Sequence, residues 1–375
     1  MTRSTLLGVD TAAIIAAGEA LGLDRVGVCT TEPFTEVRRT LIERRRRGLS
    51  DRLSFTFTDP DRSTDVRRSH PWAERLVVAG RAYLPEAGNP GPPRPRSGRI
   101  ARFSTDDHYR PLVDALEGLA ALLGEGGWRA EILVDDNRLV DRAAAVRAGI
   151  GWWGKNTMVL APGQGPWMLL GSIVTDAELE VTEPSLRSCG TCSACLPACP
   201  TGALIAPGVL DARRCIAALL QQRGSIPIEI REAVGDRIYG CDDCLDACPP
   251  GVRAVERTEV VAGRVDLHEL IEMPDDELDR RFDRFYVPGR KMRFLRRNLI
   301  VALGNAGDRS SLPLLERFLA CDDPLLASHA IWAIGRIGGP LALSMLSGLD
   351  PASLEPEARS DLQSALAGLE APIGK

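Results

Sequence analysis

Along the first half of the chain, apolar residues recur with two different periods, and the period changes from one segment to the next. Spacings of three and four residues, as in the Ala-rich segment 11–21, predict helices, whereas short apolar runs such as RLVVA at 75–79 predict strands. Because the two kinds of segment follow one another in turn, we expect an α/β or α+β domain that ends near residue 185. The predicted helices are 11–21, 111–124 and 139–149, and the predicted strands are 26–29, 75–79, 129–134 and 166–174.

Two segments of the first half are predicted from their composition and not from the spacing of apolar residues. The Pro- and Gly-rich stretch 85–98 predicts a loop. A further helix is expected between the first two strands, and it carries the charge run Glu43–Arg47. We interpret this run as a solvated helix face, with a contact to RNA as the alternative.

Beyond residue 255 the chain is predicted to be helical and repetitive. The segment NLIVALGNAG at 298–307 recurs as HAIWAIGRIG at 329–338, 31 residues later. This pattern indicates paired helices of the HEAT type, which stack into a continuous core and offer a concave binding face. Because two copies are few, we expect this module to pack against the rest of the protein.

Composition narrows the class of protein. With 375 residues, of which 44% are hydrophobic, the chain is long enough for two or three domains and is neither a disulfide-bonded miniprotein nor a disordered chain. No run approaches the roughly 20 apolar residues of a membrane span, and residues 1–7 lack the features of a secretory signal. We therefore expect a soluble protein of the cytoplasm that contacts no membrane.

Basic residues are concentrated immediately before the first repeat. The formal net charge of −5 means that any binding to nucleic acid requires such a local patch. If the stretch is helical, residues 290, 293 and 297 share one face. The candidate phosphate-binding residues are Arg290, Lys291, Arg293, Arg296 and Arg297.

Eight of the ten cysteines lie between residues 189 and 248, and their spacing is specific. In a cytoplasmic chain, clustered cysteines more often bind metal than form disulfides. The first run, C-x2-C-x2-C-x3-C-P at 189–200, is that of bacterial ferredoxins. A second, altered run has one cysteine at 215 and the series C-x2-C-x3-C-P at 241–249. Together they supply the eight thiolates that two four-iron clusters require.

The ferredoxin spacing also predicts which cysteines share a cluster. In this run the fourth cysteine binds the other cluster, because the x3 step points it away from the first three. Cluster one is therefore expected on Cys189, Cys192, Cys195 and Cys248, and cluster two on Cys199, Cys215, Cys241 and Cys244. The alternative is structural zinc, which also prefers C-x2-C pairs, but the triple run with its CP ending favours iron–sulfur. Cys29 and Cys321 stand alone in apolar surroundings and are expected to be small buried residues.

The stretch 135–158 is the densest in polar residues and is the candidate for a second site. Asp135 follows a predicted strand, a position where catalytic acids often lie in α/β folds, although Asp136 or Asn137 could instead cap the next helix. The Gly-rich loop 149–156 allows the backbone to approach a ligand closely, and its alternative is an ordinary tight turn. The sequence has no GxGxxG motif after a strand and no Walker loop, and its four histidines argue against a histidine-bound metal.

These motifs together resemble the epoxyqueuosine reductase family, cobalamin-dependent iron–sulfur enzymes of the last step of queuosine synthesis in tRNA. The matching segments begin with VD at 134–135, RA at 142–143, RAGIGWWGKNT at 147–157, CGTC at 189–192 and LDARRCI at 210–216. They continue with RIYGCDDC at 237–244 and LRRNL at 295–299, and the resemblance extends from about residue 75 to about residue 340. Because the motifs are long and keep their order, the chain is identified as a member of this family.

The resemblance implies a mechanism and a set of site residues. Two 4Fe–4S clusters, reduced by a low-potential electron donor, would pass single electrons to cobalamin in the N-terminal domain. The reduced cobalt would drive loss of the epoxide oxygen from the modified base, which must be splayed out of the tRNA. Asp135 is implied as the general acid, because burial beside the macrocycle would raise its pKa. The implied cofactor-binding residues are Gly154, Lys155, Asn156 and Thr157, and the implied binding site for the tRNA anticodon stem-loop is the repeat with its basic patch.

The expected organisation is a monomer of three consecutive domains. These are a cobalamin-binding α/β (α+β) catalytic domain at 1–185, a ferredoxin-like double-cluster insert at 186–255 and a C-terminal α-helical HEAT-like repeat at 256–375. The chain departs from the family after Asp135, where Arg138 and Asp141 stand in a segment that usually carries Pro and Glu. Two alternatives therefore stay open: a related cobalamin and iron–sulfur reductase of a small-molecule electrophile, and an electron-transfer or corrinoid-reactivating protein.

Overall fold

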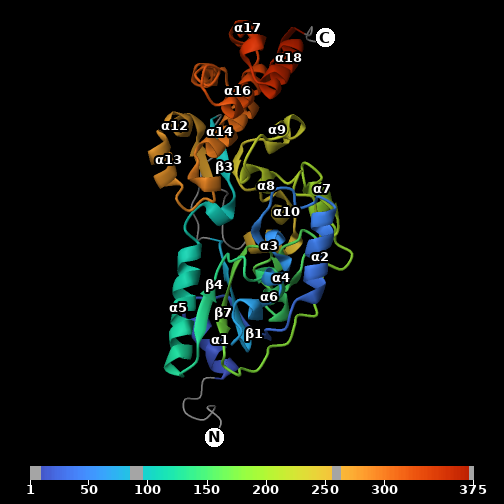
Figure 1. Cartoon of the computed structure of the whole chain (residues 1–375), viewed down its shortest axis with the longest axis vertical. Coiled ribbons are helices and arrows are strands. Elements are labelled where there is room, and N and C mark those ends of the chain that lie inside the picture. Colours follow the sequence, from blue (N-terminus) through green and yellow to red (C-terminus); the bar gives the residue numbers. More distant parts are fainter. Residues whose placement is uncertain (1–9, 85–95, 256–262, 371–375) are drawn as a thin grey trace. The chain divides into compact units, whose positions relative to one another are not determined.

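The computed structural model describes residues 10–84, 96–255 and 263–370. The chain packs into two compact units, each assembled from separate segments (Figure 1). The first unit comprises 1–88, 106–213 and 243–260, and the second comprises 89–105, 214–242 and 261–375. The cysteine-rich segment contributes to both units. The three consecutive domains expected from the sequence remain a prediction, whereas the packing groups the chain in this discontinuous way.

An antiparallel four-stranded sheet forms the core of the first unit. Val77 lies in its interior, paired with Val28 on one side and with Ile173 on the other, so a row of β-branched side chains crosses the sheet. All pairings in this sheet are antiparallel, so the unit is α+β, one of the two classes expected. The strand order is β1 (Arg25–Thr30), β2 (Arg75–Ala82), β7 (Met168–Thr175) and β4 (Ala130–Leu133).

Helices cover both faces of this sheet. The leucine stripe of α5 (Tyr109–Glu125) packs on one face, where a Cβ on Gly171 would lie 2.5 Å from Leu116 Cδ1. On the other face, α6 (Asp141–Arg147) packs its alanines into a cluster with Leu76 and Val78. The other helical segments of this part are α1 (Thr11–Ala20), α2 (Thr35–Arg46), α3 (Phe55–Thr58), α4 (Pro60–Ser63) and the 3₁₀ turn Val66–Arg68.

Short elements surround the cysteines that belong to the first unit. Four-residue helices are typical of a segment whose shape is set by ligand loops instead of by a large apolar core. The strands are β5 (Trp152–Trp153), β6 (Val159–Leu160), β8 (Leu204–Ala206) and β9 (Val209–Leu210), and the helices are α7 (Cys195–Ala198), α10 (Asp243–Asp246) and α11 (Pro249–Val255).

The second unit combines a three-stranded sheet with stacked helices. Its strand order is β10 (Arg237–Tyr239), β3 (Ser97–Ile100) and β11 (Gly263–Asp266). The 3₁₀ turns are Arg102–Ser104, Pro288–Arg290, Arg309–Ser311 and Pro351–Ser353. The helices are α8 (Ile216–Leu220), α9 (Ile228–Val234), α12 (Leu267–Glu272), α13 (Asp275–Arg281), α14 (Arg293–Ala306), α15 (Leu312–Glu316), α16 (Pro324–Ile337), α17 (Pro340–Ser347) and α18 (Pro356–Glu370).

The glycine of each sequence repeat marks the point where the next long helix crosses. A Cβ on Gly304 of α14 would lie 2.8 Å from the backbone Cα of Ala333 in α16. A Cβ on Gly335 of α16 would likewise lie 2.5 Å from the Cβ of Ala365 in α18. The repeat of 31 residues in the sequence is thus a repeat of one close helix–helix contact.

The predicted elements of the first half are all present, with two corrections. Residues 97–100 form strand β3 instead of continuing the loop predicted at 85–98, of which 85–95 lie outside the described residues. The helix predicted from residue 139 begins at Asp141, and its N-cap, Val140, makes no side-chain cap. Asp136 instead accepts a hydrogen bond from the backbone N of Arg138 at 2.8 Å, which closes a local turn before the helix starts.

We predict that Gly304→Ala destabilises the second unit by about 1–3 kcal/mol, because the added methyl group meets backbone atoms of α16 that cannot rotate away. Urea unfolding of the two proteins measures this cost. The matched control is Gly368→Ala in α18, where nothing lies within 4 Å of the new Cβ and helix propensity alone should leave stability equal or higher. Equal stability of the two variants would contradict the close crossing.

Candidate functional site

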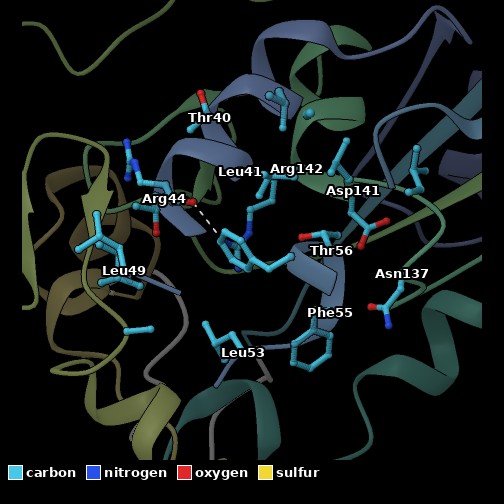
Figure 2. Close-up of a pocket in the computed structure, with 18 of the residues that line it drawn as sticks. Thr40, Leu41, Arg44, Leu49, Leu53, Phe55, Thr56, Asn137, Asp141 and Arg142 are labelled. Carbon is cyan, nitrogen blue, oxygen red and sulfur yellow. Dashed lines mark hydrogen bonds between the residues drawn. The ribbon is translucent and has the colours of Figure 1, made fainter. Parts of the chain in front are cut away.

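A cavity of about 390 Å³ opens in the first unit beside α2. Figure 2 shows that α2 contributes Thr40, Leu41 and Arg44 to the lining. The segment after β4 and the first turn of α6 contribute the acidic part, which includes Asp135 and Asp141. Most of the remaining wall is apolar, from Val37, Leu49, Leu53, Leu139, Val140 and Leu210. An apolar cavity with a few convergent polar groups is the usual form of a cofactor or substrate site.

Backbone strain is concentrated at this cavity. In the described part of the chain, five non-glycine residues have positive φ, and three of them line the cavity. These are Phe55 at φ 27°, Asp135 at φ 50° and Thr157 at φ 68°. The value for Thr157 is the most unusual, because a β-branched residue rarely adopts this conformation. Such strain persists only where the surrounding structure enforces it, and it clusters at functional sites.

Asp135, the candidate acid, is held at the rim of the cavity. Strand β4 ends at Leu133, and the positive φ of Asp135 turns the chain away from the sheet. Although the residue keeps exposed surface, the protein packed around its carboxyl removes enough water to raise the pKa of Asp135. Arg142 opposes this shift and Asp136 adds to it. The group therefore holds a proton more readily than an ordinary aspartate does.

The neighbouring Asp136 has the opposite electrostatic surroundings. Arg138 donates to Asp136 from Nε at 3.0 Å and from Nη2 at 2.7 Å, and these bonds lower the pKa of Asp136. The same guanidinium donates from Nη1 to Oε1 of Glu131 at 2.6 Å. Arg138, one of the departures from the family pattern, thus fixes the turn that carries Asp135. Two adjacent aspartates are pushed toward different protonation states, which is the usual basis for dividing acid and base roles.

Asp141 is a cavity residue that the sequence analysis did not select. Its Oδ1 is buried and has no hydrogen-bond partner among the described residues. Burial raises the pKa of Asp141 to about 8, with the charge of Asp135 adding to the shift and Arg142 opposing it. An aspartate in the first turn of a helix is common and does not by itself indicate a site. In the sequence, Asp141 is distinguished only by its position in the segment that departs from the family pattern.

Four cysteines line a second, smaller cavity in the same unit. Cys189, Cys192, Cys195 and Cys248, the expected cluster-one ligands, share it with Lys155, Asn156, Leu160 and Pro249. Burial, with smaller contributions from the other three thiols, raises the pKa of Cys248 to about 11, so the four sulfur atoms act on one another electrostatically. Among the described residues no group of three or more side chains could hold a single metal ion. A cubane uses a different arrangement, in which each thiolate around a cavity binds a separate iron.

The loop at 154–157 lines both cavities. Thr157 contributes to the larger one, and Lys155 and Asn156 contribute to the cysteine-lined one. Lys155 Nζ donates to the carbonyl of Gly190 at 2.8 Å, and Asn156 Nδ2 donates to the carbonyl of Cys244 at 3.4 Å. Gly154 has no room for a side chain, because a Cβ there would lie 2.4 Å from Asn156 Oδ1. The backbone N of Thr157 donates to the carbonyl of Gly154 at 3.0 Å, so the loop contains a tight turn, and the contacts of Lys155 and Asn156 hold it between the two cavities.

The expected cluster-two ligands are divided between the units. Cys199 and Cys244 belong to the first unit, and Cys215 and Cys241 belong to the second. Burial opposes ionisation of Cys199, but hydrogen bonds from Thr201 and from backbone amides outweigh it and lower the pKa of this thiol. One of these donors is the backbone N of Ala203, 3.2 Å from Sγ. In the second unit Cys215 is the N-cap residue of α8, and Cys241 packs beside an apolar cluster.

The two isolated cysteines differ in burial. Cys29 in β1 is 1% exposed, and burial raises its pKa to about 12, as expected for a small apolar residue of the core. Cys321 is only half-buried, and its thiol donates to the carbonyl of Phe318 at 3.2 Å. Neither residue lines the two cavities described above.

The basic patch predicted before the first repeat requires a correction. Arg297 has 0% exposure and binds backbone carbonyls, among them those of Leu219 at 2.9 Å and Gln222 at 3.0 Å, so it cannot bind phosphate. The expected shared face is also absent, because α14 starts at Arg293 while Arg290 precedes it with φ 51°. The remaining charge of the patch depends on the other four residues.

Three of those four residues are already engaged within the protein. Arg290 donates to the carbonyls of Asp283 at 3.1 Å and Phe285 at 2.8 Å. Arg293 pairs with Asp323 at 2.5 Å, and Arg296 pairs with Asp275 at 2.6 Å. Of the five, only Lys291 has an exposed side chain that makes no hydrogen bond or ion pair to another described residue.

Comparisons with known proteins find relatives that agree with one another in family and domain content. Residues 188–251 match the 4Fe–4S double cluster binding domain, and residues 294–367 match HEAT repeats. The chain is 34% identical over 350 residues to an epoxyqueuosine reductase of Bacillus cereus, covering 87% of this chain and 88% of that one. It is 31% identical over 372 residues to the Bacillus subtilis enzyme, covering 96% and 95%.

Solved structures of similar proteins cover nearly the whole chain. An epoxyqueuosine reductase crystallised with an epoxyqueuosine-modified tRNA stem loop has a TM-score of 0.87 at 29% identity, over 96% of this chain and 98% of that one. A structure of the Bacillus subtilis enzyme, described with its catalytic aspartate loop swung out of the active site, has a TM-score of 0.86 at 29% identity, over 96% and 98%. Of the helices that the structure describes, none has the length and apolar character to cross a bilayer.

We predict that Asp141→Asn becomes more stabilising as pH rises. The carboxyl titrates near 3.8 when unfolded and at about 8 when folded, so between these values the folded state binds a proton that the unfolded state has lost. Stability therefore falls as pH rises through this window, and the penalty is complete above it. Urea unfolding at pH 4 and pH 9 should show the variant gaining about 5 kcal/mol relative to the parent, since each pKa unit corresponds to about 1.4 kcal/mol.

Asp136→Asn is the control with opposite sign. Its pKa is lowered, so the native carboxylate stabilises the fold above the ordinary aspartate pKa, and this contribution disappears as pH falls through the lowered value. The variant should therefore lose stability at pH 9 and approach the parent in acid. A pH-independent difference for Asp141→Asn would show that its carboxyl is not desolvated.

We also predict that Arg297→Gln severely destabilises the second unit, by about 3 kcal/mol or more, because several buried carbonyls lose their charged donor. The matched control is Lys291→Gln, which removes the same charge from an exposed side chain and should leave thermal unfolding within about 0.5 kcal/mol of the parent. Thermal unfolding measures both. An unchanged Tm for Arg297→Gln would return this residue to the candidate RNA-binding set.

Proposed function

The chain belongs to the epoxyqueuosine reductase family, and on that premise we propose that it removes the epoxide oxygen of epoxyqueuosine in tRNA. Its relatives are oxidoreductases, and one of them was crystallised with an epoxyqueuosine-modified tRNA stem loop. The single observation that carries the proposal is the placement of Asp135. This residue stands on a strained turn, in a cavity whose wall continues through 154–157 to the cysteine-lined cavity.

The general acid of this reaction is Asp135. A protonated carboxyl can donate to the oxygen as its bond to carbon breaks, and the raised pKa of Asp135 means that this carboxyl holds its proton more readily than an ordinary aspartate does. A relative at 29% identity is described as having a catalytic aspartate loop, which supports the same role for the loop after β4. Arg138 holds that loop through Asp136 and Glu131, so it positions Asp135 without touching the substrate.

The larger cavity suits cobalamin. A flat macrocycle needs apolar and aromatic walls, and Trp153 lines the cavity with 45% of its surface exposed, together with Phe55 and several leucines. The residues that would hold the cofactor are these side chains and the loop Gly154, Lys155, Asn156 and Thr157, of which Thr157 reaches the cavity itself. When bound, cobalamin supplies low-potential electrons to the substrate. The chain lines the space with apolar side chains and places the proton of Asp135 there.

The thiolates hold the electron carriers. Cluster one is assigned to Cys189, Cys192, Cys195 and Cys248, which share one cavity. Cluster two is assigned to Cys199, Cys215, Cys241 and Cys244 from their spacing. Burial raises the pKa of Cys195 at the cysteine-lined cavity, and the ammonium of Lys155 opposes this shift and so favours the thiolate, which is the form that binds iron. An external low-potential donor is the source of electrons for the clusters. We also infer that the enzyme acts as a monomer in the cytoplasm.

The tRNA anticodon stem-loop is the macromolecular substrate. Part of its backbone is contacted by Lys291, with the half-exposed side chains of Arg290 and Arg293 beside it in the chain. Arg296 and Arg297 are excluded from direct contact, because their donors bind protein acceptors in less exposed positions. This smaller set predicts a modest electrostatic contribution from the stretch before the repeat.

The test of the proposed function is an anaerobic turnover assay. The protein is reconstituted with iron, sulfide and cobalamin, reduced, and supplied with tRNA that bears epoxyqueuosine, and the digested tRNA is analysed by mass spectrometry for loss of one oxygen. Asp135→Asn should lower the rate about 10²–10⁴-fold while iron content stays at that of the parent. Asp61→Asn, which removes an exposed carboxyl of the same unit, should retain full activity.

Two outcomes would count against this function. Full activity of Asp135→Asn would remove the acid from its role. Absence of product from a parent protein with two complete clusters and bound cobalamin would show that this chain acts on a different electrophile.

A further inference from the structure

Three aspartates, Asp135, Asp136 and Asp141, line the cavity, and the proposed mechanism uses only Asp135 as an acid. Figure 2 shows the carboxyl of Asp141 directed toward the space that Thr56 and Asn137 also line. Its Oδ1 is buried and has no hydrogen-bond partner among the described residues. A buried carboxyl oxygen without a donor is costly when the group is charged, so its presence requires an explanation.

The groups around Asp141 do not provide enough positive charge to keep it ionised. Asp135 and Asp136 face it from the segment after β4, and both disfavour a second negative charge. Arg142 follows it in α6, but that side chain is exposed and donates from Nη1 to the carbonyl of Thr157 at 3.3 Å. Arg44 of α2 donates from Nη1 to the carbonyl of Gly208 at 3.3 Å. Asp141 therefore carries a proton at neutral pH, in agreement with its raised pKa.

The reaction needs a second proton. Removing an epoxide oxygen breaks two carbon–oxygen bonds, leaves a carbon–carbon double bond and releases water. The balanced step consumes two electrons and two protons. Two 4Fe–4S clusters can each release one electron. Asp135 can give one proton, and the second must reach the oxygen before water leaves.

We propose that Asp141 stores this second proton and returns it to Asp135 within the cavity, so that the two aspartates form a two-proton reservoir for one turnover. The inference rests on the proposed function. Asp141 makes no contact with the substrate. It acts only through Asp135, to which it supplies a proton, and is therefore a positioning residue. After turnover, solvent restores the proton through the open side of the cavity.

The alternative is that Asp141 only shapes the first turn of α6. A structural role would be met equally by Asn, which has the same shape and cannot release a proton. It would also leave the pH dependence of turnover unchanged. The two explanations are therefore separated by protonation itself and by the pH profile.

Infrared difference spectroscopy on the protein without cobalamin or tRNA tests the storage. The parent should show the C=O stretch of a protonated carboxyl at pH 6, and this band should disappear as pH rises through about 8. Asp135→Asn should keep the component of this band that titrates near pH 8, and Asp141→Asn should lack that component. Absence of such a component in the parent, or its persistence in Asp141→Asn, would overturn the proposal.

Turnover as a function of pH tests the delivery. The parent rate should fall above pH 8, and Asp141→Asn should be slower by about tenfold or more at pH 7 and lose that limb of the profile. Asp141→Glu should restore the limb and most of the rate. A parent-like profile in Asp141→Asn would overturn proton delivery even if the infrared band is found.

Failure of the proposed function gives a different result. The parent would then yield no deoxygenated tRNA, and the delivery step would be refuted with it, while the infrared band, which needs neither substrate nor cofactor, would still report whether Asp141 holds a proton.

Discussion

Side chains that can carry negative charge are concentrated at two neighbouring cavities of the first unit, and the loop 154–157 separates these cavities. One cavity is lined by four cysteines and the other by three aspartates. The loop is narrow because Gly154 carries no side chain, and it is rigid because Asn156 binds both the backbone N of Met158 at 3.2 Å and the carbonyl of Cys244. Every charge in these cavities depends on its own local donors or on a proton, since the protein replaces part of the surrounding water.

The strained backbone is the cost of this arrangement. Phe55, Asp135 and Thr157 adopt positive φ, at about 1–3 kcal/mol each. The antiparallel sheet, with Val77 and Ile173 fully buried, supplies the rigid base that offsets it. Around Asp135 the strain is held by Arg138, which joins Asp136 to Glu131 across the turn. Arg138 departs from the family pattern, so this chain fixes a shared loop in its own way.

Whether a feature could be predicted from the sequence depends on how far apart in the chain the interacting residues lie. The strands and helices of the first unit are local patterns, and the cysteine runs are patterns of fixed spacing, so both are readable along the chain. Asp141 was missed because the burial of its Oδ1 depends on the wall of a cavity assembled from α2, α3 and the loop at 154–157. The basic patch was misjudged for the same reason: the carbonyls that bind Arg297 come from residues 219–224, far away in the sequence.

Arginine in this chain is largely a structural cation, and this changes how an RNA-binding surface should be sought. Only three of the 46 basic residues are lysines. A guanidinium presents five donors in a fixed plane, so Arg297 and Arg231 can each bind several buried acceptors at once, whereas an ammonium cannot match that geometry. Counting arginines therefore overestimates the charge available to phosphate. The informative residues are cations whose donors have no protein acceptor, and in the stretch before the first repeat Lys291 meets that criterion among the described residues.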